Sequence, residues 1–307
     1  MGNPTRDRTW LVAVSAALWG TDALLRKPLA DALPAATVVF WEHAITLVVL
    51  LPWLPSAVRA FGRLGARERV AVIVIGVGAS ALATALFTRA FAIGDPVTPL
   101  VLQKFQPLFA IVAARFLLGE HIRRGYLWFA VPALAGAWLL TFPNPFHVSV
   151  TAATPALLAL GAAALWAAGT VLGRLAGGRL TPHQLTVLRY VFGFVGATAI
   201  VLVTGAPLTV HAGDAVGLVL LALIPGLLAL SMYYVGLRTT PAARATLAEL
   251  AFPATAALIG VTWLGASLSA GQWLGLVIVV AAVTGLGWHE RRTASPVVAE
   301  PAVPVEV

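Results

Sequence analysis

Cysteine is absent from this sequence of 307 residues, and charged side chains make up only 10% of it. Without cysteine the chain forms no disulfide, no thiolate metal site and no cysteine nucleophile. Soluble domains carry about 25% charged residues, so this chain lacks the charge needed to cover a water-exposed surface. Hydrophobic residues make up 60% of it and the mean hydropathy is +0.91. These values predict an all-α integral membrane protein.

Motifs for catalysis and for nucleotide binding are also missing. The sequence contains no Walker loop, no His-Glu-x-x-His and no Gly-x-Ser-x-Gly, and its histidines lack metal-ligand spacing. We therefore predict no enzyme activity, no cofactor and no metal site. The net charge of +8 does not indicate a nucleic-acid partner, because the basic residues recur in short connections between apolar runs.

Ten apolar runs are long enough to be membrane spans, which need roughly 20 residues each. The predicted spans are 10–30, 35–54, 69–91, 97–118, 124–142, 154–175, 184–204, 214–237, 242–264 and 271–289. The first run follows two arginines, as in a signal peptide, but it is too long for one and lacks a clear cleavage site. We interpret it as a retained span. Residues 290–307 are predicted to be a disordered cytoplasmic tail.

The basic residues indicate how the spans are oriented. Of the 20 Lys and Arg residues, 14 fall on one side of the predicted membrane, three on the other and three inside spans. Because cytoplasmic loops are enriched in Lys and Arg, this asymmetry predicts that both termini are cytoplasmic. An even number of spans follows. We expect a multi-pass protein of the cell inner (plasma) membrane.

The two halves of the chain resemble each other at a spacing near 147 residues. Leu18-Trp19 aligns in this way with Leu165-Trp166. The predicted repeats are 10–142 and 154–289. Each holds five spans, so the second copy must be inverted in the membrane. Inverted repeats are typical of secondary transporters, whose substrate site lies at the repeat interface near the midplane. The alternative is an ancient duplication in a membrane protein that transports nothing.

Short motifs recur in the same order in both halves. They are Leu18-Trp19-Gly20, Lys27 and Pro34; Pro107, Leu118-Gly119-Glu120, Gly125 and Gly136; and Pro253, Leu264-Gly265, Gly275 and Gly285. With these motifs, residues 10–290 resemble the EamA-type, ten-helix branch of the drug/metabolite transporter superfamily. The resemblance implies a ten-helix basket around a central cavity that opens alternately to each side. It also implies transport, commonly export, of amino acids, related metabolites or drugs.

Polar residues inside the spans are candidates for a substrate path, because a charge in the bilayer usually faces a cavity or a partner. The predicted path residues are Asp22, Glu42, His43, Gln103, Lys104, Gln106, Arg189, Glu249, Trp19 and Trp41. Asp22, Glu42 and Lys104 are predicted to lie about 10–12 Å below the outer surface, at 1.5 Å per residue. Arg189 and Glu249 fall in the inner half. We expect an outer polar cluster and an inner one that lines or gates the path.

Each of these residues also has a structural interpretation. Lys104 can pair with Asp22 or Glu42 and simply hold spans together. His43 can be a hydrogen-bonded packing residue, and the two tryptophans can pack against neighbours instead of stacking on a substrate. Asp22 and Glu42 are candidate carriers of a coupling proton, because burial favours the neutral form of a carboxyl group.

These patterns predict a secondary transporter, in the direction of export, of small polar metabolites such as amino acids. Acid and base in one cavity suit a zwitterion, and protons are a candidate coupling ion. Cationic metabolites or drugs are the alternative cargo, and an intramembrane enzyme acting on lipids is a remote alternative. The expected partners are the small-molecule substrate and the lipid bilayer, with no nucleic acid. Monomer and homodimer both stay open.

Overall fold

The computed structural model describes residues 8–93, 102, 105–119, 125, 127–141, 144, 146, 153–263 and 267–293. Within these ranges the regular structure is entirely helical, as predicted. Five helices are long and apolar enough to cross a membrane: Ala35–Gly62, Ala66–Phe87, Ala153–Ala176, Pro182–Thr204 and Ala212–Leu237. Shorter apolar helices are Thr9–Gly20, Gln106–Leu117, Leu127–Leu140 and Ala270–Leu286.

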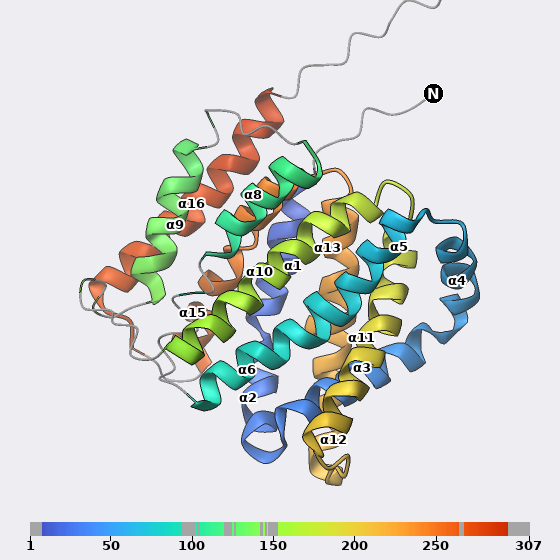
Figure 1. Ribbon diagram of the computed structural model, residues 1–307. Coiled ribbons are helices and arrows are strands. Elements are labelled where there is room, and N and C mark those ends of the chain that lie inside the picture. The colour runs from blue at the N-terminus through green and yellow to red at the C-terminus, as the bar shows by residue number, and fades with distance from the viewer. Residues whose placement is uncertain are drawn as a thin grey trace, which may run out of the picture.

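The described helices follow the predicted spans along the chain (Figure 1). In the first half they are α1 (Thr9–Gly20), α2 (Asp22–Ala32), α3 (Ala35–Leu50), η1 (Leu51–Trp53), α4 (Leu54–Gly62), α5 (Ala66–Ile73), η2 (Val74–Leu82), α6 (Ala83–Ile93), α8 (Gln106–Leu117) and α9 (Leu127–Thr141). In the second half they are α10 (Ala153–Ala176), α11 (Pro182–Thr204), α12 (Ala212–Leu221), η4 (Ala222–Leu228), α13 (Ala229–Leu237), α14 (Ala242–Ala248), α15 (Ala251–Trp263) and α16 (Ala270–Thr293). Residues 290–293 of the predicted tail therefore belong to α16, and 294–307 lie outside the described residues.

Three of the long helical segments are interrupted in their middle. The rods α5–η2–α6 and α12–η4–α13 each contain a π-helical segment, Val74–Leu82 and Ala222–Leu228 respectively. These two segments begin 148 positions apart, close to the spacing of the sequence repeat. The third interruption, at Glu249 and Leu250, separates α14 from α15. Because π-helical turns are rare and frequently mark functional sites, the centres of these interrupted helices are candidate functional sites.

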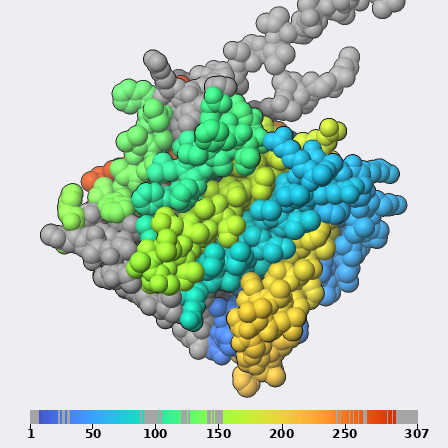
Figure 2. All heavy atoms as spheres, in the orientation of Figure 1, coloured from blue at the N-terminus to red at the C-terminus, as the bar shows by residue number. Residues whose placement is uncertain are grey.

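The helices pack in matching pairs across the two halves. α1 packs against α13 and α15, and its counterpart α10 packs against α6 and α8. α3 packs against α11, and α9 against α16. Figure 2 shows the α10 side of this arrangement, with α10 lying between α8 and the rod of η2 and α6. The start of α1 and the end of α16 lie at the same end of the bundle in Figure 1.

Glycine permits a close contact between α9 and α16. A Cβ atom on Gly136 would lie 2.9 Å from the carbonyl oxygen of Gly275, and a Cβ on Gly275 would lie 2.6 Å from that of Gly136. Any side chain at either position would therefore meet the backbone of the partner helix. Both glycines belong to the repeated motifs.

Large apolar side chains cover much of the outer surface. Phe116 is 83% exposed, Trp128 82% and Leu202 78%. Soluble monomers rarely expose contiguous apolar surface of this kind, whereas lipid tails accept it without penalty. The surface therefore agrees with a bundle embedded in a bilayer, with its polar groups turned inward.

Candidate functional site

A polar cavity of about 150 Å³ lies among α1, α2, α3, η2, α6, α10, α11, η4 and α13. It is lined by Trp19, Asp22, Val39, Glu42, His43, Ala79, Ser80, Thr84, Trp166, Arg189, Tyr190, Pro225, Gly226 and Leu230. Both halves of the chain contribute, and both π-helical segments form part of the wall. The cavity therefore lies at the interface of the two repeats, where repeat-built transporters place their substrates.

Four pairs of lining residues are separated by the repeat spacing of 147. They are Trp19 and Trp166, Glu42 and Arg189, His43 and Tyr190, and Ala79 and Gly226. Equivalent positions of the two halves thus face one space. An acid in the first repeat is matched by a base in the second, so the cavity is symmetric in position and asymmetric in charge.

His43 is fixed in one orientation by two hydrogen bonds. Its Nδ1 lies 2.8 Å from the carbonyl oxygen of Val39, which can only accept, so Nδ1 carries a proton. Its Nε2 lies 2.9 Å from the hydroxyl of Ser80 on η2. The ring is 4% exposed and lies 5.4 Å from the ring of Tyr190. Gly193 makes room for it, since a Cβ there would lie 2.6 Å from Cδ2.

Arg189 brings a buried guanidinium group to the cavity. Its Nη1 donates to the hydroxyl of Tyr234 at 3.1 Å. Its Nε is buried and has no hydrogen-bond partner among the described residues. An unsatisfied buried donor is costly, and a guanidinium group recognises planar acceptors such as carboxylates. Arg189 is therefore the residue best placed to bind acceptor oxygens of a substrate.

Acidic and aromatic side chains line the same cavity as Arg189. A Cβ on Gly226 of η4 would lie 3.2 Å from the hydroxyl of Tyr190 and 3.8 Å from Oε1 of Glu42, so both oxygens face that backbone. The ring of Trp19 packs 5.1 Å from that of Tyr233. Trp166 packs 5.0 Å from Phe87 in the equivalent helix contact. Two supported indoles thus line a cavity that also carries both signs of charge.

A second polar cluster lies beside this cavity, at the break between α14 and α15. Glu249 Oε2 accepts a hydrogen bond from Gln106 Nε2 at 2.8 Å. Its Oε1 accepts from the hydroxyl of Tyr233 at 2.8 Å and lies 3.2 Å from that of Thr170. The hydroxyls of Thr170 and Tyr233 are themselves 2.8 Å apart. Four separate helical segments therefore meet at one carboxyl group.

The structure places the predicted path residues in three groups. The cavity holds five of them: Trp19, Asp22, Glu42, His43 and Arg189. Gln106 and Glu249 meet in the second cluster. Trp41 does not line the cavity, because its indole donates to the carbonyl oxygen of Leu208 and packs against the leucines of α2 and α12. Gln103 and Lys104 lie outside the described residues.

Arg189 does not belong to a separate inner cluster, as the depth estimate had it. It lines the same cavity as Glu42 instead. Each residue lies seven positions beyond the first residue of its helix, α3 or α11. At 1.5 Å per residue this is about 10 Å along the axis of each helix.

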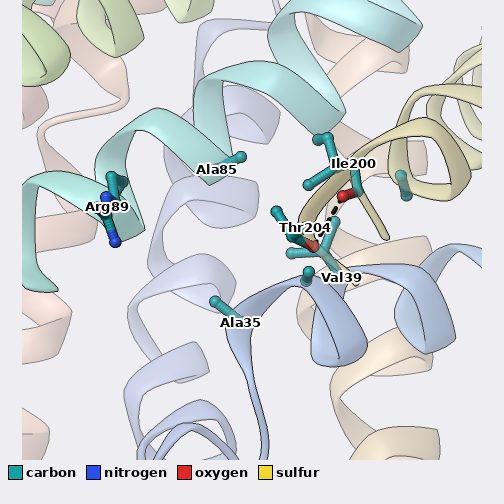
Figure 3. A pocket seen from close by; sticks show the side chains of 8 residues that line it. Ala35, Val39, Ala85, Arg89, Ile200 and Thr204 are labelled. Atoms are coloured by element: carbon teal, nitrogen blue, oxygen red, sulfur yellow. Dashed lines mark hydrogen bonds between the residues drawn. The ribbon is translucent and has the colours of Figure 1, made fainter. Parts of the chain in front are cut away.

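A second cavity, of about 230 Å³, adjoins the first (Figure 3). Val39 lines both cavities. The walls of the second cavity are mainly apolar side chains of α3, α6 and α11. Arg89 is the charged residue that lines it. The hydroxyl of Thr204 is turned back to the carbonyl oxygen of Ile200 at 2.8 Å. This cavity offers an apolar approach to the polar one, with the exposed Arg89 at its wall.

The predicted path omitted several residues that the structure brings to the two polar clusters. They are Ser80, Trp166, Thr170, Tyr190, Tyr233 and Tyr234. The repeat spacing was the available signal for two of them, since adding 147 to Trp19 and His43 gives Trp166 and Tyr190. The others are neutral hydroxyls, whose burial no charge pattern signals.

A helical bundle with an apolar outer surface and a charged internal cavity, built from two repeats, is a membrane transporter in class. Comparison with known proteins agrees. The EamA-like transporter family matches residues 9–142 and again residues 153–288. The chain belongs to this family, whose members are multi-pass membrane proteins, and it contains two copies of the family repeat.

Relatives of known name support the same class. The riboflavin transporter ImpX of Fusobacterium nucleatum is 31% identical over 285 residues, which is 89% of this chain and 95% of the relative. A riboflavin transporter of Rhizobium johnstonii is 28% identical over 278 residues, covering 85% of this chain and 83% of its own. A solved crystal structure of a protein has a TM-score of 0.76 at 20% identity and covers 95% of this chain and all of its own, which supports the fold.

Proposed function

We propose that this transporter carries a planar heteroaromatic metabolite of the riboflavin class, and that the polar cavity is its binding site. The observation that carries the proposal is the pair Trp19 and Trp166 on a cavity that also holds Arg189. Two relatives that align with most of this chain are named riboflavin transporters. The chemical groups of a flavin are complementary to the side chains that line this cavity.

Riboflavin has three parts that the cavity can address. Its flat tricyclic ring stacks on indoles, which gain about 0.5–1.5 kcal/mol per aromatic pair beyond the burial of area. The carbonyl oxygens at one edge of the ring suit the guanidinium group of Arg189, whose Nε lacks a partner among the described residues. The polyhydroxy side chain suits the acid and hydroxyl groups of Asp22, Glu42 and Thr84.

The cavity must widen to take such a ligand. Its volume of about 150 Å³ is below the roughly 300–1,000 Å³ of most small-molecule pockets. The adjoining cavity of about 230 Å³ shares Val39 with it and provides the direction in which it can open. Separation of α3 from α6 and α11 would join the two, as alternating access requires of one side of a transporter.

An amino acid is the second candidate substrate, favoured by the cavity as it stands. A volume of about 150 Å³ accommodates a small zwitterion without widening, and the cavity offers Glu42 or Asp22 for an ammonium group and Arg189 for a carboxylate. The indoles at Trp19 and Trp166 have no role in binding a small aliphatic zwitterion, so flavins rank first.

Flux measurements with the purified protein in proteoliposomes separate the two substrates. We expect uptake of riboflavin above that of empty vesicles, with competition by other flavins and none by amino acids. Amino-acid flux without riboflavin flux would replace the first candidate by the second. Loading the vesicles from inside tests export, the direction that the family resemblance implies. No flux of either class would refute the proposal.

The proposed architecture is ten spans in two inverted five-helix repeats, with both termini in the cytoplasm. The lack of native cysteine allows a direct test. Gly62 and Gly213 are exposed and have open space around them. The architecture predicts that an impermeant maleimide added to intact cells labels Gly213→Cys but not Gly62→Cys. Labelling of both at equal rates, or of Gly62→Cys alone, would contradict it.

A further inference from the structure

We propose that Glu249, with Tyr233 and Thr170, is the binding site of a coupling proton, and that the proton it takes up strengthens substrate binding at Arg189. This inference rests on the proposed function, because it couples a proton to the substrate of the polar cavity. It assigns the coupling proton to a carboxyl group that does not itself line that cavity.

The cluster around Glu249 has one hydrogen too few for its contacts when the carboxyl group is ionised. Three oxygens, Glu249 Oε1, Tyr233 Oη and Thr170 Oγ1, lie 2.8, 2.8 and 3.2 Å from one another. The two hydroxyls bring one hydrogen each, so an ionised carboxylate leaves one of these contacts without a hydrogen. A proton on Oε1 supplies it and closes a ring of three hydrogen bonds. Gln106 keeps donating to Oε2 in both forms.

No cation lies at hydrogen-bond distance from Glu249 among the described residues. The groups that donate to it there are neutral: an amide and two hydroxyls. A carboxylate held inside a membrane by neutral groups is not neutralised by an ion pair, and it can be neutralised by a proton. Glu249 is only partly buried.

Other titratable or charged groups lie on the surrounding elements. They are Arg115 on α8, Arg174 on α10, His183, Arg189 and Tyr190 on α11, Tyr233 and Tyr234 on α13, Arg244 on α14, and His289, Glu290, Arg291 and Arg292 on α16. Arg115 is exposed, and Arg174 donates to the carbonyl oxygen of Arg238. Arg189 interacts electrostatically with Glu249 and is the described cation that links it to the cavity.

Two contacts connect Glu249 to the substrate cavity through neighbouring tyrosines of α13. Tyr233 donates to Glu249 and packs its ring 5.1 Å from Trp19, which lines the cavity. Tyr234 accepts a hydrogen bond from Arg189 and lies ring to ring with Tyr233 at 5.5 Å. A ligand that stacks on Trp19 or binds Arg189 therefore acts on the groups that hold the Glu249 proton.

The charge of Glu249 determines whether its proton strengthens or weakens substrate binding at Arg189. An ionised Glu249 attracts the Arg189 guanidinium group and competes with acceptor oxygens of a substrate. A neutral Glu249 leaves that group free for the substrate, so substrate and proton bind together and travel in the same direction. Substrate affinity is then highest at low pH, and it falls by at most about tenfold per pH unit, towards the affinity of the ionised form, once Glu249 ionises in the free protein.

The first measurement needs no substrate. Infrared spectra of the purified full-length protein, recorded across pH, should show the carbonyl band of a protonated carboxylic acid that titrates in the wild type. The band should disappear in Glu249→Gln and persist in Glu68→Gln, a matched change at the first turn of α5. If Glu249→Gln does not fold, Tyr233→Phe should shift the band by removing one hydrogen-bond donor. A band unchanged in the folded variants would refute the proton site.

The second measurement follows riboflavin binding across pH by the quenching of flavin fluorescence. We expect the pH dependence to be lost in Glu249→Gln, which should bind with the affinity of the wild type at low pH. The same pH dependence in Glu249→Gln and in the wild type would refute the coupling. If the wild type binds no riboflavin at any pH, the proposed substrate is wrong, while the infrared measurement still decides the proton site.

Discussion

Replacing Gly193 by alanine should disrupt the cavity wall through His43. The new Cβ would lie 2.6 Å from Cδ2 and 2.7 Å from Nε2 of the imidazole ring. Carbon atoms in ordinary contact are about 3.5–4.0 Å apart, so the ring must move by about 1 Å. His43 holds its two hydrogen bonds at 2.8 and 2.9 Å, and a shift of this size breaks at least one of them.

The expected loss of stability can be worked out from these contacts. Overpacking costs about 1–3 kcal/mol, and each lost hydrogen bond adds about 1 kcal/mol. Alanine regains up to about 1 kcal/mol through its higher helix propensity. The free energy of unfolding of Gly193→Ala should therefore fall by about 1–4 kcal/mol, measured by denaturant unfolding in detergent.

A double-mutant cycle attributes this loss to the imidazole ring. Combining Gly193→Ala with His43→Ala removes the collision, so the two changes should cost less together than the sum of each alone, by about 0.5–3 kcal/mol. Gly62→Ala is the matched control, because a Cβ there meets nothing within 4 Å. An additive double mutant, or a Gly193→Ala protein as stable as the Gly62→Ala control, would refute the reasoning.

Three further predictions concern packing and recognition. Gly275→Ala should lower the free energy of unfolding by about 1–3 kcal/mol, whereas Gly271→Ala, whose nearest neighbour lies at 3.9 Å, should not; denaturant unfolding compares them. Trp166→Ala should weaken riboflavin binding up to about tenfold in fluorescence titrations, and Trp166→Phe by less, because a ring still stacks. Arg189→Lys keeps the charge but loses the planar fork of donors, so riboflavin affinity should fall further than in Tyr234→Phe, which removes one contact of that fork. Equal affinities for these two variants would show that the guanidinium group does not bind the substrate.

Much of this fold can be predicted from the sequence, because the lipid bilayer restricts which segments can cross it. A helix that crosses the membrane needs a long apolar run, and the described helices lie along the predicted runs. The repeat was readable from Leu18-Trp19 and Leu165-Trp166, and the family match to residues 9–142 and 153–288 confirms two repeats. The inversion of the second repeat stays a prediction.

The site was predictable in its charged members and less so in its neutral ones. A charged residue inside a predicted span is easily recognised in the sequence. Asp22, Glu42 and Arg189 were selected in this way, and all three line one cavity. Which face a residue presents depends on local helix geometry. A π-helical turn inserts an extra residue and rotates all that follows, and hydropathy does not reveal it. The tyrosine pair Tyr233 and Tyr234 follows such a segment, η4, and escaped prediction.

Trp41 shows how a tertiary contact can hold a candidate side chain away from the cavity. Its depth in a predicted span made it a candidate for stacking on a substrate, yet its indole donates to the carbonyl oxygen of Leu208 at 3.0 Å. The acceptor of this indole N–H is a backbone carbonyl 167 positions away in the chain. The position of a residue in the sequence predicts its depth in the membrane. It does not predict which group from elsewhere in the chain its side chain contacts.

The most direct test of the central claim, that the polar cavity binds the transported substrate, uses the cysteine-free background. Thr84→Cys places a thiol on the cavity wall, and Gly213→Cys places one at the exposed start of α12, outside the cavity. Saturating riboflavin should slow the reaction of a thiol reagent with Thr84→Cys and leave the reaction of Gly213→Cys unchanged. Equal reaction rates for Thr84→Cys with and without riboflavin, in protein that demonstrably transports it, would place the substrate elsewhere.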